Sequence, residues 1–239
     1  MTTRINLLSG PRNISTALMY SFAQRKDTKV FDEPLYAHYL SKSNAKEYHP
    51  GAHEILKSQN NDGSEVVKMM LSNNQSEVLF FKNMAHHIIE MDYSFLLQMT
   101  NVFLTRHPKD MLTSFSKVIT NPTIDEVGYK KHLELLEFLE TNSKKPIVLD
   151  SKAILINPER TLHTLCSAIG IPFEENMLKW PSKPRKEDGV WAKYWYKSVH
   201  QSTHFMNNQT NTNSFPKQLN ELLEECMPYY NRLLEYSIG

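Results

Sequence analysis

Two short polar segments carry the residues best suited to bind an anion. The first runs from Ser9 to Thr16 and contains Arg12, and the second begins at Arg106 and reaches Ser114. Each follows a short apolar run and precedes an amphipathic stretch, which is the pattern of a strand, a tight loop and a helix. The start of a helix presents free N–H groups and a partial positive charge, so both loops suit phosphate. Two such loops in one chain predict a ligand with two separated phosphate groups.

The first loop differs from the phosphate loop of ATP- and GTP-binding proteins, which reads G-x-x-x-x-G-K-[ST]. Counted from Gly10, Ser15 stands at the second Gly, Thr16 at the Lys and Ala17 at the hydroxyl that binds magnesium. The cation comes early instead, at Arg12, whose planar fork suits a phosphate or a transferred group. A sulfuryl group in a phosphosulfate anhydride carries less charge than a terminal phosphoryl group, so protein cations can neutralise it without a metal. The alternative interpretation is an ordinary turn followed by a helix N-cap.

Both segments resemble motifs of the sulfotransferases that use 3′-phosphoadenosine-5′-phosphosulfate (PAPS). That family's 5′-phosphosulfate loop reads P-[KR]-S-G-T-T, and residues 11–16 keep its proline, its basic residue and both final hydroxyls. Its 3′-phosphate segment reads R-x-P-x-D-x-x-x-S, and residues 106–114 match every defined position. The resemblance implies PAPS as co-substrate and 3′-phosphoadenosine 5′-phosphate (PAP) as product. The donor-binding residues that it implies are Arg12, Asn13, Ile14, Ser15, Thr16, Arg106 and Ser114.

Some positions depart from the family pattern. Ile14 replaces the glycine of the loop, which is the position with the most backbone freedom. Ala17 stands where the cytosolic branch has a tryptophan that stacks on adenine. That branch also has R-K-G-x-x-G-x-W-K near its C-terminus, and residues 185–193 match it loosely. The resemblance therefore implies Arg185 and Lys186 as further 3′-phosphate contacts.

Sulfuryl transfer requires a base for the acceptor's proton and cations for the transferring group. The cytosolic sulfotransferases carry K-x-H after their third strand, and here Lys82 matches the lysine while Met84 stands at the histidine. Enzymes that sulfate protein tyrosines use a Glu after the second strand instead, and Glu33 lies at the corresponding spacing, 21 residues after Arg12. The resemblance implies Glu33 as general base, with Arg12 and Lys82 stabilising the sulfuryl group and the leaving phosphate.

Other interpretations of these residues stay open. Glu33 can be an acidic residue at a helix start, and His86 or His87 is the rival base. We expect no metal site, since neither H-E-x-x-H nor a Cys/His spacing is present. The aromatic residues between Trp191 and Tyr196 either pack in the core or cover the ligand.

The elements that position these residues alternate between strands and helices. Helical patterns cover Ser15–Arg25, Met84–Met99, Thr123–Thr141 and Pro158–Ile169, and residues 201–214 read as a flexible loop. Mostly continuous apolar runs are typical of parallel strands covered on both faces. The predicted strands are Ile5–Ser9, Thr28–Phe31, Val78–Lys82, Asn101–Thr105 and Pro146–Leu149.

Composition excludes several classes. A net charge of +1 gives no support for a nucleic-acid partner, and no run approaches the ~20 apolar residues of a membrane span. Two cysteines do not make a disulfide framework, and no leader is recognisable, so we expect a cytoplasmic protein.

Together these observations predict an α/β, P-loop-type three-layer fold, with a central, mostly parallel sheet of about five strands flanked by helices. We expect one sulfotransferase-like domain over residues 1–239 that transfers a sulfuryl group from PAPS to a hydroxyl or amine of a small-molecule acceptor, without a metal. The rivals are a nucleotide-dependent phosphotransferase and a non-catalytic PAP- or PAPS-binding module. Neither the acceptor nor the oligomeric state follows from the sequence.

Overall fold

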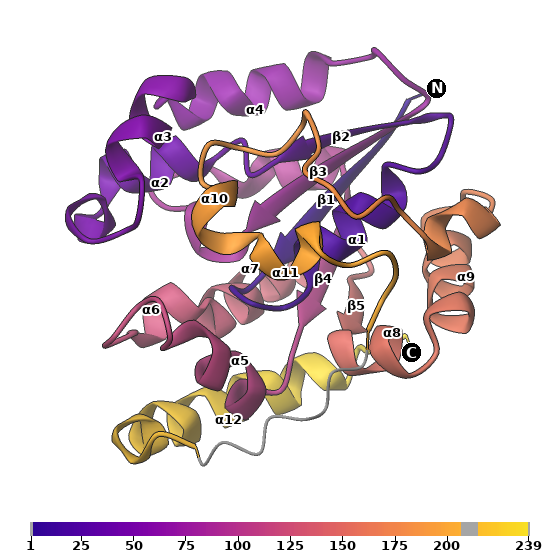
Figure 1. Cartoon of the computed structure of the whole chain (residues 1–239). Coiled ribbons are helices and arrows are strands. Elements are labelled where there is room, and N and C mark those ends of the chain that lie inside the picture. Colours follow the sequence, from indigo (N-terminus) through magenta and orange to yellow (C-terminus); the bar gives the residue numbers. More distant parts are fainter. Residues whose placement is uncertain (1, 207–214, 239) are drawn as a thin grey trace.

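A computed structural model describes residues 2–206 and 215–238, and these form a five-stranded parallel sheet surrounded by helices (Figure 1). The strands lie in the order β2-β3-β1-β4-β5. Their bounds are β1 (Thr3–Ser9), β2 (Thr28–Asp32), β3 (Val78–Met84), β4 (Thr100–Thr105) and β5 (Ile147–Asp150). The predicted P-loop-type α/β fold and all five predicted strands are confirmed, with ends that differ by at most two residues.

The helices of the described residues differ more from the prediction. The α-helices are α1 (Ser15–Phe22), α2 (Tyr36–Lys42), α3 (Ala52–Ser58), α4 (Gly63–Ser72), α5 (Pro108–Phe115), α6 (Ile124–Val127), α7 (Tyr129–Thr141), α8 (Ser151–Ile156), α9 (Pro158–Ile169), α10 (Ala192–Trp195), α11 (Lys197–His200) and α12 (Asn220–Leu234). Short 3-10 helices cover Asn44–Glu47, Ala85–His87, Tyr93–Gln98, Glu175–Leu178 and Lys217–Leu219.

Helix α9 matches its prediction at both ends because Asn157 caps it and Gly170 ends it in the left-handed conformation, with φ 84°. The predicted helix over Met84–Met99 is wrong, since β3 extends to Met84 and two 3-10 helices follow, with Glu90 between them at a positive φ of 50°. The predicted helix over Thr123–Thr141 is broken at Gly128, where φ is 78°. The loop predicted over 201–214 falls mostly outside the described residues.

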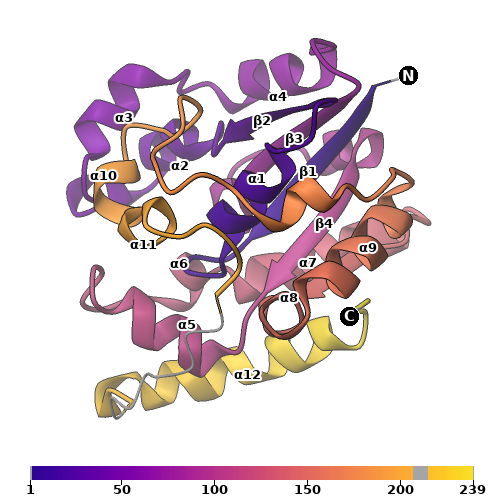
Figure 2. The same ribbon diagram turned by 45° about the vertical axis from the view of Figure 1, so that its right-hand side comes forward.

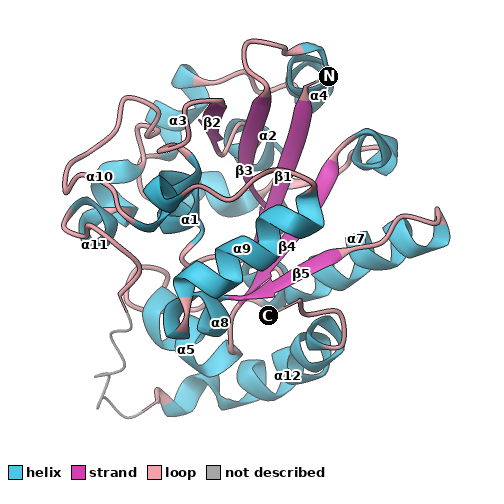
Figure 3. Ribbon diagram, turned by 90° about the vertical axis from the view of Figure 1, so that its right-hand side faces the viewer, coloured by secondary structure: helices cyan, strands magenta, loops and turns pink. Residues whose placement is uncertain are grey.

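Two apolar clusters cover the two faces of the sheet. Leu8, Phe81 and Phe103 of the central strands pack against α4, α5, α7 and α12, whereas Leu7 and Phe80 pack against α1, α8 and α9. This alternation follows from the two-residue period of a strand. Figure 3 shows α9 crossing one face of the sheet, and Figure 2 shows α12 beside α5 along the lower edge of the molecule.

Buried asparagines link the three central strands. The Asn83 side-chain amide donates to Asn6 Oδ1 at 2.9 Å, and the Asn6 amide donates to Asn101 Oδ1 at 3.0 Å. A slip of one residue would move every side chain of a strand to the opposite face of the sheet and break these bonds, so they favour the observed register. The register in turn brings the carboxyl ends of the strands to one edge of the sheet, where Ser9 pairs with Met84.

Candidate active site

A cavity of about 1330 Å³ opens at this carboxyl edge. It is lined by the loops that follow β1, β2, β3 and β4, by the start of α8 and by residues between Trp195 and Met206. Open α/β sheets bind ligands at this edge. The structure brings the following predicted residues together around the cavity: Arg12, Asn13, Ile14, Ser15, Thr16, Glu33, His86, His87, Arg106 and Ser114.

The loop between β1 and α1 has an unusual backbone. Arg12 and Ile14 both adopt positive φ, 56° and 64°. For a β-branched residue such as Ile14 this conformation costs about 1–2 kcal/mol, so the loop keeps a shape for which glycine is the easier choice. The Asn13 side-chain amide donates to the Leu104 carbonyl at 3.0 Å and ties the loop to the end of β4. Among the described residues no side chain caps the start of α1, so its N–H groups suit an anion.

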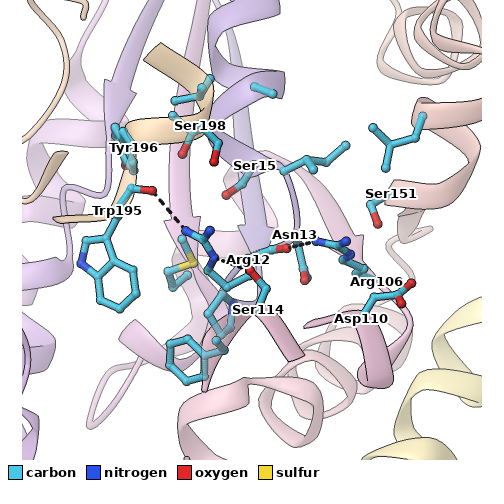
Figure 4. A pocket seen from close by; sticks show the side chains of 18 of the residues that line it. Arg12, Asn13, Ser15, Arg106, Asp110, Ser114, Ser151, Trp195, Tyr196 and Ser198 are labelled. Atoms are coloured by element: carbon cyan, nitrogen blue, oxygen red, sulfur yellow. Dashed lines mark hydrogen bonds between the residues drawn. The ribbon is translucent and has the colours of Figure 1, made fainter. Parts of the chain in front are cut away.

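Two arginines at this loop are partly buried (Figure 4): Arg12 belongs to the loop, and Arg106 contacts its backbone. Arg106 Nη1 donates to the Arg12 carbonyl at 2.7 Å, while Arg12 Nε donates to Ser114 Oγ at 2.9 Å and its Nη1 to the Trp195 carbonyl at 3.1 Å. Burial lowers the pKa of both guanidiniums, and the charge of Arg106 lowers that of Arg12 further. Within the described residues neither guanidinium donates a hydrogen bond to a carboxylate. The pair therefore offers two positive charges to an anionic ligand.

Glu33 belongs to a buried polar network at the end of β2. In the sheet register Asp32 pairs with Lys82, so the Lys82 ammonium donates to Asp32 Oδ1 at 2.9 Å and also to Glu33 Oε1. Tyr196 enters from the far end of the chain, and its hydroxyl oxygen accepts from Lys82 at 2.8 Å and donates to Asp32 at 2.8 Å. The backbone of Glu33 has a φ of 41°. A strained backbone at a buried acid is typical of functional sites.

The network carries one more negative than positive charge, which affects its protonation. Burial raises the pKa of Glu33, the charge of Asp32 raises it further, and Lys82 opposes both. Burial alone would lower the pKa of Lys82, but the two carboxylates together raise it, so this side chain stays an ammonium. A carboxylate with a raised pKa accepts a proton more readily than an ordinary one, which suits Glu33 to act as a general base.

The two histidines that follow β3 are buried and electrically neutral. Burial lowers the pKa of His86 to about 3 and that of His87 well below its ordinary value. A general base works best with a pKa near the operating pH. The raised pKa of Glu33 and the lowered pKa of both histidines therefore favour Glu33.

Other predicted residues lie outside the cavity lining. Lys82 is fully buried and contacts Glu33 rather than the cavity. Arg185 and Lys186 line a second, smaller hollow of about 450 Å³ next to β2, and Arg185 pairs there with Glu187 at 3.1 Å. Within residues 2–206 and 215–238, no group of three or more His, Cys, Asp or Glu side chains is arranged to hold a metal ion. In the same ranges no helix has the length and apolar character needed to cross a membrane.

Sequence reasoning missed the partners of Glu33. Asp32 adjoins Glu33 without a sequence signal that marks its role, and Tyr196 and Trp195 are predicted only as aromatic residues of the core or of a cover. Tyr196 lies 163 residues from Glu33 along the chain, and no local sequence pattern predicts that contact.

Comparison with known proteins identifies the family. The model of a family described as Sulfotransferase domain matches residues 3–236. The chain belongs to this sulfotransferase family. The resemblance drawn from the two loops is therefore confirmed.

Relatives of this sulfotransferase domain occur in plants. Two Arabidopsis thaliana proteins, branched-chain-amino-acid aminotransferase-like proteins 2 and 1, are 35% and 37% identical to it over 231 residues. These matches cover 96% of the chain but 41% of each plant protein, so the chain spans about two-fifths of the length of these curated relatives.

Solved structures share the fold of this sulfotransferase domain. The sulfotransferase domain of the Synechococcus PCC 7002 olefin synthase is 14% identical, with a TM-score of 0.55 over 94% of this chain and 95% of that one. The domain from the curacin biosynthetic pathway is 18% identical, with a TM-score of 0.56 over 100% and 99%. A sulfotransferase from Alicyclobacillus acidocaldarius is 10% identical, with a TM-score of 0.58 over 98% and 95%.

Proposed function

We propose that this sulfotransferase domain transfers a sulfuryl group from PAPS to a hydroxyl or amine of a small-molecule acceptor. The observation that carries the proposal is the pair Arg12 and Arg106 beside the uncapped start of α1, with Glu33 in the same cavity. Two positive charges suit the two anionic ends of PAPS, and a buried carboxylate suits the acceptor's proton. The cavity exceeds the roughly 300–1,000 Å³ of a typical single-ligand pocket, which leaves room for donor and acceptor together.

In this proposal PAPS lies along the loop between β1 and α1 and extends to Arg106. The loop residues Asn13, Ile14, Ser15 and Thr16 supply N–H groups and hydroxyls to the 5′-phosphosulfate, and Arg106 and Ser114 bind the 3′-phosphate. Arg12 donates hydrogen bonds to Ser114 and to the Trp195 carbonyl. Its remaining N–H groups bind the 5′-phosphosulfate of PAPS in this proposal. Arg185 and Lys186 have no part in this binding mode, since they line the other hollow.

The chemical step is an in-line displacement at sulfur. The acceptor oxygen or nitrogen forms a bond to sulfur while the bond from sulfur to the bridging phosphate oxygen breaks. The bridging oxygen leaves with the electron pair as part of PAP, whose 5′-phosphate charge Arg12 stabilises. The acceptor's proton moves to Glu33. Lys82 acts through Glu33 as a positioning residue, because its ammonium holds that carboxylate by a direct ion pair. The protein cations carry the charge, and the step needs no metal.

Turnover tests the proposal directly. The protein is incubated with PAPS, a mixture of small alcohols, phenols and amines, and a chelator, and PAP and sulfated products are measured by mass spectrometry. We expect sulfated products to form, and PAP to be released at the summed rate of those products. The proposal fails if PAPS is not consumed, or if added magnesium and ATP yield a phosphorylated product instead.

A further inference from the structure

The cavity has an aromatic end. We define the aromatic chamber as the six lining residues Tyr36, His49, His86, His87, Phe115 and Trp195. Figure 4 shows Trp195 on one side of Arg12, with Arg106 on the other side. Since the 3′-phosphate is proposed to lie at Arg106, the aromatic chamber lies at the acceptor end of the cavity.

The rings of the aromatic chamber hold one another in place. The Tyr36 and His87 rings stack at 4.7 Å with 20° between their planes, and the Phe115 and Trp195 rings stack at 6.2 Å with 24°. A hydrogen bond of 2.9 Å joins the Tyr36 hydroxyl to His49 Nδ1. Tyr36, His87 and Phe115 are at most 3% exposed and form the packed backing of the wall, whereas Trp195 is partly exposed. The Trp195 ring is therefore the face on which a flat ligand can stack without rearrangement of the protein.

The aromatic chamber carries no ionic group of its own. Burial lowers the pKa of His49 to about 4, and the pKa of His86 and His87 is lowered as well, so all three imidazoles are neutral near pH 7. The nearby charge of Lys82 is more than balanced by the two carboxylates of Asp32 and Glu33. Glu126 lies 4.0 Å from His49 but does not line the cavity. Arg12 bonds to the Trp195 carbonyl, but its charge is proposed to serve the 5′ end of the donor. With the donor bound, a charged acceptor would lose its hydration here without gaining a further partner of opposite charge, apart from Glu33 itself.

We propose that the aromatic chamber binds the acceptor and selects an uncharged, planar aromatic alcohol, whose hydroxyl points to Glu33. The inference rests on the proposed function and names the acceptor class for the same site. A phenol ionises near pH 10, far more readily than an aliphatic alcohol, so a buried carboxylate suffices to take its proton. The phenolic oxygen forms the bond to sulfur, the proton passes to Glu33, and PAP leaves with the bridging oxygen.

A set of acceptors of matched size tests the inference. The initial rates of PAP formation are measured with PAPS and 4-methylphenol, 4-methylcyclohexanol, 4-hydroxybenzoate or tyramine, and PAP affinity is measured by calorimetry. We expect kcat/KM to be highest for 4-methylphenol. For the cyclohexanol, loss of ring stacking lowers kcat/KM by about threefold to tenfold or more. For the two charged phenols, kcat/KM falls by about tenfold or more.

Two neighbouring aromatic residues on α10 supply matched variants. Trp195→Ala removes a wall of the aromatic chamber and raises the KM for 4-methylphenol about threefold to tenfold, with PAP affinity unchanged. Tyr194→Ala changes neither value, because Tyr194 is 40% exposed and does not line the cavity.

The results separate the two claims. If PAP does not bind and no acceptor is turned over, the proposed function itself fails. If the cyclohexanol or a charged phenol equals 4-methylphenol, or only the cyclohexanol is turned over, the function stands and the acceptor class is wrong. If PAP binds but no acceptor is turned over, a non-catalytic binding module replaces the proposed function. Equal effects of Trp195→Ala and Tyr194→Ala on KM also overturn the inference.

Discussion

Replacing Glu33 by glutamine separates catalysis from stability. The change keeps the shape of the side chain and removes the group proposed to take the acceptor's proton. A positioned general base contributes about 10²–10⁴-fold to rate, or roughly 2.7–5.5 kcal/mol of transition-state stabilisation. We therefore expect Glu33→Gln to lower kcat by about 10²–10⁴-fold in the PAPS assay, while calorimetry shows PAP affinity within about twofold of wild type, since Glu33 does not belong to the proposed donor site.

The same Glu33→Gln substitution should raise the free energy of unfolding or leave it unchanged. Folding raises the pKa of Glu33, so the charged carboxylate is less favourable in the folded chain than in the unfolded one. Stability is then lost as the pH rises through that raised pKa, and a neutral glutamine avoids the loss. Asp32 remains to neutralise Lys82. We expect chemical denaturation at pH 7 to give an unfolding free energy equal to or above that of wild type.

Glu126 provides the matched control for this variant. Its buried carboxylate accepts hydrogen bonds from Thr123 and from the Tyr48 hydroxyl at 2.7 Å, but it does not line the cavity. We expect Glu126→Gln to lower the unfolding free energy by about 1–3 kcal/mol and leave kcat unchanged. The reasoning is refuted if Glu33→Gln keeps kcat and instead costs the roughly 3–5 kcal/mol of a broken buried ion pair.

Three further changes test the site. Because the Asp32 charge raises the pKa of Glu33, and the base works when ionised, Asp32→Asn moves the rising limb of the pH–kcat profile to lower pH. In denaturation experiments, the unfolding free energy of the Ile14→Gly variant is about 0.5–1 kcal/mol higher than that of Ile14→Ala, since glycine tolerates a φ of 64°. Tyr196→Phe removes a hydroxyl bonded to Asp32 and Lys82 and lowers kcat about tenfold in the PAPS assay, with unchanged PAP affinity.

The strands and both candidate anion-binding loops follow from local patterns in the sequence. A strand covered on both faces reads as a short apolar run, and the loop after it reads as polar residues with Gly or Pro. Asn157, Pro158 and Gly170 also mark the ends of α9 by themselves. These features depend on neighbours in the chain, so no tertiary contact is needed to predict them.

The environment of Glu33 could not be predicted, because it depends on register and on distant contacts. Only the pairing of β2 with β3 places Asp32 opposite Lys82, and Tyr196 reaches them from the other end of the chain. The sequence also leaves open whether His86 is charged, which its burial decides. Arg185 matches a motif, yet it packs over the Tyr20 ring and faces the second hollow.

The central claim is that two arginines form one site for a ligand with two phosphates. The most direct test is calorimetric titration of PAP without magnesium into wild type, Arg106→Ala and the control Arg185→Ala, whose arginine lines the other hollow. We predict micromolar binding that weakens by about 10- to 150-fold in Arg106→Ala, from the loss of charge-assisted hydrogen bonds, and by less than about twofold in Arg185→Ala. Wild type that fails to bind PAP, or an Arg106→Ala variant that binds it as tightly, would contradict the account.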